Sequence, residues 1–167
     1  MAIRERRGPR GGRSCPARPR RAPLTRLLID TSVLLKWFHS EGESELDQAP
    51  KLRSAHVAGE LHAHMLDLAP YEVGNVLSRA LRWTAGDVAD QLDDLSAILG
   101  PPLVITPAWL RRAAALAHLH SLPFYDASWA ATAAELGIPL ISADRRLLDA
   151  GLAESPTQVA TRASGCE

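Results

Sequence analysis

The chain lacks several features that define whole classes of protein. It has only two cysteines, Cys15 and Cys166, near opposite ends, so we expect neither a disulfide framework nor a cysteine metal site, and a reducing compartment suits it. No run approaches the roughly 18 apolar residues of a membrane helix. The Arg-rich start is not followed by the apolar stretch that an export signal needs. These absences predict a cytoplasmic protein.

The chain also has no net charge, but its charges are unevenly placed. Residues 1–26 contain nine arginines and one acidic residue, Glu5, with four prolines and three glycines, so the rest of the chain carries a net charge of −8. We therefore predict a disordered Arg/Pro/Gly-rich tail at 1–25, one globular domain at 26–160 and a flexible end at 161–167. The tail is interpreted as a solvated extension or as a start codon assigned too far upstream, with RNA binding as the alternative. An acidic domain repels nucleic acid unless a basic patch or bound cations intervene.

Short apolar strands alternate with helices along the domain. Strands are predicted at 26–29, 61–70, 101–107 and 138–144, with a feeble last strand near the end of the chain. Helices are predicted at 31–38, 71–83, 85–99, 108–122 and 125–137, and a weakly patterned helix within the polar stretch 39–60. This alternation predicts an α/β fold with a parallel sheet covered on both faces, whose ligand sites lie at the carboxyl ends of the strands.

Four acidic residues stand at that edge of the predicted sheet. Asp30 and Asp144 end strands, whereas Glu72 and Asp126 begin helices. All four are expected to converge although they are far apart in sequence. Each also has a local alternative. Asp30, Asp126 and Asp144 suit helix N-caps, and Glu72 suits the first turn of a helix, where its charge complements the helix dipole.

Clustered carboxylates raise one another's pKa and are costly unless cations occupy the cluster. Because the ligands are oxygens alone, we expect Mg²⁺, with Mn²⁺ as the alternative, orienting a water and neutralising charge on a phosphodiester. Nearby polar side chains can orient the carboxylates or hold a metal-bound water. They are Thr31, Ser32, Asn75 and Ser142, for which helix capping and turn bonding remain equal alternatives.

Three segments carry a resemblance to a known family. They are "LLIDTSVLLKWF", "APYEVGNVLSRAL", "FYDASWAATAAELGIPLISADRRL" and their order along residues 26–150. This pattern resembles the PIN-domain ribonucleases, specifically the VapC-type toxins of bacterial toxin–antitoxin modules. The resemblance implies a three-layer α/β/α fold with a short parallel sheet of four or five strands and a metal-dependent endoribonuclease. It places the acidic metal site at Asp30, Glu72, Asp126 and Asp144.

The resemblance also implies partners. We expect a homodimer, an RNA substrate and a VapB-type antitoxin whose C-terminal segment covers the site. Such an antitoxin is predicted to place a basic side chain among the carboxylates and an apolar helix against exposed side chains of residues 33–38.

Two other functions remain as alternatives. One is a non-catalytic PIN-fold module that binds a protein through a vestigial pocket. The other is a haloacid-dehalogenase-type phosphatase, whose Asp-x-Asp pattern needs a carboxylate where this chain has Ser32. The pairs His62/His64 and His118/His120 are interpreted as exposed histidines, because a tetrahedral metal site needs further ligands at suitable spacing.

Overall fold

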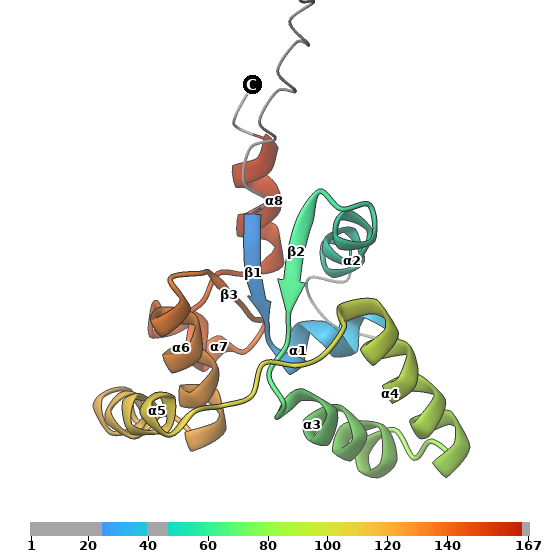
Figure 1. Ribbon diagram of the computed structural model, residues 1–167, viewed down its shortest axis with the longest axis horizontal. Helices are drawn as coiled ribbons and strands as arrows, with labels where there is room; N and C mark the ends of the chain where they lie inside the picture. The colour runs from blue at the N-terminus through green and yellow to red at the C-terminus, as the bar shows by residue number, and fades with distance from the viewer. Residues whose placement is uncertain (1–24, 40–46, 165–167) are drawn as a thin grey trace, which may run out of the picture.

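The computed structural model describes residues 25–39 and 47–164 of the chain (Figure 1). The predicted tail, apart from Thr25, and the last three residues of the predicted C-terminal segment lie outside the described residues. No helix in the described part of the chain is both long enough and apolar enough to cross a membrane.

Three parallel strands form the sheet, in the order β2-β1-β3. β1 (Thr25–Ile29) pairs with β2 (Leu61–His64) on one side and with β3 (Leu140–Ile141) on the other. Single parallel bridges, Leu66 to Leu103 and Ile141 to Glu154, add one chain segment beyond each outer strand. The prediction of an α/β fold with a short parallel sheet is confirmed. The described residues form three strands where four or five were expected, and the two further segments contribute only single bridges.

The segment 101–107 forms much less strand than predicted. Only Leu103 pairs: its N–H donates to the Met65 carbonyl at 2.8 Å, and its own carbonyl accepts from Asp67 N at 2.9 Å. Pro101, Pro102 and Pro107 leave the segment short of the N–H donors that a longer ladder would need. The prediction of a full strand at 101–107 was therefore wrong.

The end of the domain is helical. We expected a feeble last strand, but after the Glu154 bridge the chain forms α8 (Pro156–Ser164). Proline suits the first turn of a helix, where its missing N–H has no partner to lose. Val159 then lies buried in the core, which a strand leaving the sheet would not achieve.

The remaining helices follow the predicted alternation. They are α1 (Thr31–Leu34) with the 3₁₀ turn η1 (Leu35–Trp37), α2 (Ala49–Val57), α3 (Ala69–Asn75) with the π-helical segment η2 (Val76–Ala80), α4 (Ala85–Leu99), α5 (Pro107–His120), α6 (Phe124–Leu136) and α7 (Arg145–Asp149).

Local sequence explains where several of these helices begin and end. The side chain of Thr106 accepts a hydrogen bond from Trp109 N at 3.2 Å, and Pro107 occupies the first turn of α5. The α6 helix ends at Gly137, whose φ of 62° lies in the left-handed region that glycine adopts without steric cost. Pro70 lies in the first turn of α3, as predicted.

The core is built around β1 and α6. Leu27, Leu28 and Ile29 are completely buried, as expected for a central strand covered on both faces. In α6 every residue from 127 to 133 is buried, so this helix is packed on all sides. Figure 1 shows α8 at the amino-terminal end of β1, and α1 and α3 at the opposite, carboxyl-terminal end of the strands. That second end carries the acidic residues.

Candidate active site

Asp30 directly follows β1 and is only 6% exposed. It occupies the N-cap position of α1, but its side chain does not cap the helix. Its Oδ2 instead accepts hydrogen bonds from the Ser32 hydroxyl at 2.7 Å and the Ser142 hydroxyl at 2.6 Å. The capping alternative is therefore wrong for Asp30, and two chain segments 110 residues apart serve one carboxylate oxygen.

Backbone amides fix the direction of both hydroxyls. Ala143 N donates to Ser32 Oγ at 2.9 Å, and Asp144 N donates to Ser142 Oγ at 3.0 Å. Because each hydroxyl oxygen already accepts from an amide, its single proton is available for Asp30. The end of β3 thus holds the end of β1 in a defined geometry.

Glu72 joins three helices. Its Oε2 accepts from Thr31 Oγ1 of α1 at 2.5 Å and from Trp129 Nε1 of α6 at 3.3 Å. Sequence analysis identified Thr31 as a partner for the acidic site but did not identify Trp129. Trp129 is 1% exposed, so it serves the core as well. The missed signal was its spacing, since Trp129 lies one helical turn after Asp126.

Asp126 and Asp144 differ in their partners. Asp126 lies in the first turn of α6, whose N-cap is Pro123, so capping is wrong for Asp126 too. Its Oδ2 is buried and has no hydrogen-bond partner among the described residues. Asp144 does cap a helix, because its Oδ1 accepts from Arg146 N at 2.7 Å. Its other carboxylate oxygen is not used for that bond.

Burial and mutual repulsion raise the pKa of three of these carboxyls. Burial is the main cause for Asp30 and Glu72, with hydroxyl donors opposing it and the charge of another acid adding to it. Burial together with the charges of Asp144 and Asp30 raises the pKa of Asp126 to about 6, although Arg146 lowers it. The four predicted acids are therefore close enough to repel one another.

The fourth predicted supporting residue is placed differently. Asn75 is exposed, and its side chain makes no hydrogen bond to another described residue. Its role as a supporting donor stays a prediction, whereas Thr31, Ser32 and Ser142 each touch a carboxylate.

The donor set suits a hard divalent cation. All four acidic groups offer oxygen, and the unpaired Oδ2 of Asp126 is a buried acceptor without a donor. Within residues 25–39 and 47–164, however, no three His, Cys, Asp or Glu side chains are already grouped to hold one ion. An ion such as Mg²⁺, which usually keeps several waters and takes only one or two carboxylates, fits this looser arrangement. The residues that would hold it are Asp30, Glu72, Asp126 and Asp144.

His56, His62 and His64 lie close together, but they form no three-ligand metal group in the part of the chain that the structure describes. The His62 and His64 rings lie 4.6 Å apart, and His56 lies 5.6 Å from His62. His56 Nδ1 accepts from Ala63 N at 3.2 Å, so Nε2 carries the proton and donates to the Ile98 carbonyl at 2.9 Å. With both of its nitrogens engaged, His56 has none left to complete a site with His62 and His64.

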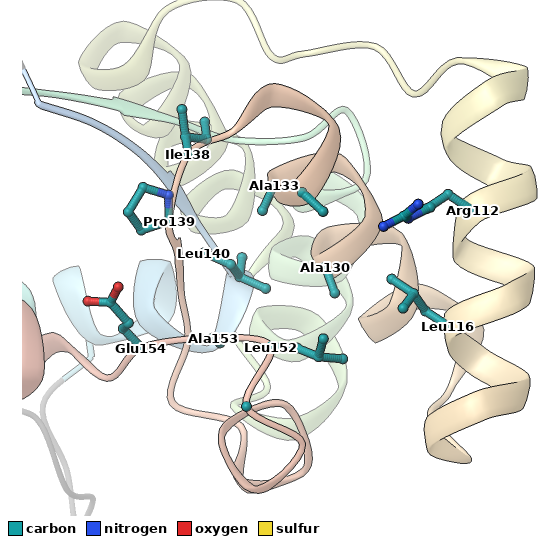
Figure 2. Close-up of a pocket in the computed structure, with 12 residues that line it drawn as sticks. Arg112, Leu116, Ala130, Ala133, Ile138, Pro139, Leu140, Leu152, Ala153 and Glu154 are labelled. Atoms are coloured by element: carbon teal, nitrogen blue, oxygen red, sulfur yellow. The ribbon is translucent and has the colours of Figure 1, made fainter.

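A separate hollow lies away from the acids. A cavity of about 330 Å³ lies between α5, α6, the start of β3 and the segment 151–154. Figure 2 shows the residues that line it. Leu116, Ala130, Leu140 and Leu152 give it a largely apolar lining, with Arg112 and Glu154 among its few charged residues. None of the four clustered acids lines it, so the acidic site is a distinct feature of the surface.

Comparison with known proteins agrees with this architecture. The PIN domain family model matches residues 27–152. Ribonuclease VapC3 of Pyrobaculum aerophilum is 32% identical over 128 residues, which cover 74% of this chain and 93% of that protein. The crystal structure of PAE2754 from Pyrobaculum aerophilum superposes with a TM-score of 0.60 at 25% identity, covering 85% of this chain and 98% of that one. The chain therefore belongs to the PIN-domain family, and its predicted likeness to the VapC type is confirmed.

Proposed function

We propose that this protein is a divalent-metal-dependent endoribonuclease and the toxin of a VapBC-type toxin–antitoxin module. One observation carries the chemical part of the proposal: four acids from separate segments meet at the carboxyl end of the sheet, where burial and repulsion raise the pKa of three of them. Such a cluster is unfavourable for the fold unless a cation neutralises it. The relative named Ribonuclease VapC3 supports RNA as the substrate.

A bound Mg²⁺ would supply a water of lowered pKa and positive charge against the phosphodiester. The protein's own contribution is orientation. Asp30 is held by two hydroxyls and Glu72 by Thr31 and the Trp129 indole, so both carboxylates are fixed in direction. Asp126 keeps one unpaired oxygen. Preorganised acceptors of this kind avoid reorganisation when charge develops during the reaction.

Arg146 of α7 brings a positive charge close to the acids. Arg146 lies close enough to Asp126 to lower its pKa, and its side chain is exposed. A guanidinium at this position can bind a phosphate oxygen in the RNA backbone while the carboxylates face the metal. Arg146 would therefore help an otherwise acidic domain to accept a polyanion.

The partners follow from the same charges. We propose a VapB-type antitoxin that silences the enzyme by placing a basic side chain among the carboxylates, and a homodimer as the active form. One part of the earlier expectation needs correction, because Leu34 and Trp37 are buried and only Leu35 and Phe38 are partly exposed. The amphipathic segment 31–38 uses its apolar face for the domain's own core, so it offers an antitoxin helix little surface.

The direct test is RNA cleavage by the full chain. A panel of single-stranded RNAs is incubated with protein and Mg²⁺ or Mn²⁺, or with excess chelator, and the products are resolved on denaturing gels. We expect cleavage that needs the metal and is lost in Asp30→Asn and Glu72→Gln, whereas Asp90→Asn, an exposed acid on α4, retains it. Full activity in excess chelator would refute the requirement for a divalent metal ion. Failure of the folded protein to cleave any RNA with either metal would favour the non-catalytic module.

A further inference from the structure

The exposed aromatic side chains are distributed unevenly. The chain has four tryptophans, two phenylalanines and two tyrosines. All four tryptophans and Phe38 are buried or partly buried, whereas Tyr71 is 79% exposed, Tyr125 61% and Phe124 45%. Both tyrosines of the protein are therefore presented to solvent.

Each tyrosine directly precedes an acid of the clustered site. Tyr71 precedes Glu72 in the first turn of α3, and Tyr125 precedes Asp126 in the first turn of α6. The two turns are joined, because Trp129 of α6 donates to Glu72 of α3 and the charges of Glu72 and Asp126 interact. Adjacent helical residues point about 100° apart, so each ring lies beside its acid at the edge of the acidic site.

From this arrangement, which rests on the proposed function, we propose that Tyr71 and Tyr125 are stacking platforms for unpaired bases of the RNA strand on the two sides of the bond that is cleaved. An RNA strand whose phosphate lies at the carboxylates can leave the acidic site over the first turns of α3 and α6, where Glu72 and Asp126 lie. Its bases then meet a flat aromatic face within one residue of the acids. Stacking on tyrosine accepts any base, so it holds the strand without dictating its sequence.

The surroundings favour a nucleic acid over an apolar protein helix. The large exposed aliphatic side chains of the described residues lie elsewhere, with Val57 in α2, Val104 in the segment before α5, and Leu110 and Leu119 in α5. A docked apolar helix would cover Glu72 and Asp126 and remove them from water without supplying charge. An RNA strand arrives with its own cations, and a tyrosine ring offers an apolar face and a hydrated hydroxyl together.

The test uses an RNA for which cleavage by the wild-type protein has been mapped to one bond. Initial rates give kcat/KM for Tyr71→Ala, Tyr125→Ala and the corresponding Phe variants. Phe124→Ala is the matched control, because Phe124 points about 200° around α6 from Asp126. Val57→Ala, at the exposed end of α2, is a second control. Each variant is also melted, since loss of an exposed ring should leave the melting temperature unchanged.

We expect each Tyr→Ala variant to lower kcat/KM by about 5- to 140-fold, the range for loss of one stacked base, while Tyr→Phe and both controls stay within about 2-fold of wild type. A second arm removes single bases by placing an abasic nucleotide at each of three positions on either side of the bond. With the abasic nucleotide at one position, wild type and Tyr125→Ala should have the same kcat/KM. With it at another position, wild type and Tyr71→Ala should have the same kcat/KM.

Two results would overturn the inference while leaving the nuclease intact. The first is a kcat/KM of both Tyr→Ala variants within about 2-fold of the wild type. Equally, the loss of kcat/KM from each Tyr→Ala change could add in full to the loss from every abasic position, which would show that no ring stacks on any of these bases. The second is unchanged cleavage with an altered oligomeric mass by light scattering, which would assign the tyrosines to a contact between protein copies. If the wild-type protein cleaves no RNA, the proposed function itself fails before the tyrosine variants are compared.

Discussion

Replacing Asp126 with Asn should stabilise the metal-free protein while it destroys activity. The Asp126 carboxyl has a pKa of about 6 in the fold, against an ordinary value of 3.8. The folded state therefore binds more protons than the unfolded state between about pH 4 and 6, so folding stability falls as pH rises through this window. Above pH 6 the ionised carboxylate carries the full penalty of burial and repulsion, and Asn carries none.

The size of the effect follows from that pKa. The displacement from 3.8 to about 6 corresponds to about 3 kcal/mol, and solvent reaching this half-buried group reduces the figure to about 2 kcal/mol. The carboxylate also gains about 0.5–1 kcal/mol from the amino end of α6, which Asn loses. We therefore expect Asp126→Asn to gain about 1 kcal/mol at pH 7.5 and almost nothing at pH 4.

Urea unfolding in excess chelator at both pH values measures this difference. The control is Asp90→Asn, which removes an exposed acid from α4 and should change stability by less than about 0.5 kcal/mol. Adding Mg²⁺ at pH 7.5 should reverse the order, because the wild type binds the ion more tightly. If Asp126→Asn is less stable than the wild type in chelator at both pH values, burial and repulsion do not penalise the ionised Asp126 carboxylate as its raised pKa implies.

Two further changes probe the neighbours of the acids. Arg146→Gln removes the cation that lowers the pKa of Asp126, so the acidic limb of the pH–rate profile should move to higher pH. Arg145→Gln, the control, should leave that limb in place. Identical profiles for the two variants would contradict the charge interaction between Arg146 and Asp126. Ser142→Ala removes a hydrogen-bond donor to the buried Asp30 carboxylate and should lower the free energy of unfolding in urea by about 1.5–3 kcal/mol. The control Ser128→Ala should cost less than about 1 kcal/mol, because the Ser128 hydroxyl donates only to a carbonyl of its own helix. Equal losses would mean that the Ser142 bond adds nothing to a generic buried serine.

The convergence of the acids was predictable because it follows from topology. In a parallel sheet the strand ends and the starts of the following helices share one edge, so residues such as Asp30 and Glu72 meet whatever the details of packing. The choice between capping and a shared site was not predictable. It depends on the exact direction of each side chain: Asp144 does cap its helix, whereas the Asp30 carboxylate turns to Ser142, 112 residues away.

The outer parts of the sheet show a second limit. Periodicity alone predicted a strand at 101–107. Whether such a segment pairs depends on how many backbone N–H groups remain between its prolines. In this segment only Leu103 pairs with a neighbouring segment. The same uncertainty affected the last segment, where Pro156 and the burial of Val159 favour a helix. Tertiary contacts decide such short, weakly patterned stretches, and they are not written in local sequence.

The most direct test of the account is a calorimetric titration of the wild-type protein and Asp30→Asn with Mn²⁺ in the absence of RNA, at pH 6 and pH 8. Because the pKa of Asp126 is raised to about 6, this carboxyl is about half protonated at pH 6, so metal binding there must release protons. Comparison of two buffers with different ionisation enthalpies should show about half a proton released at pH 6 and almost none at pH 8, with at least about 10-fold weaker binding in Asp30→Asn. Equal affinity in both proteins, or binding at pH 6 without proton release, would contradict the claim that these carboxylates form the metal site.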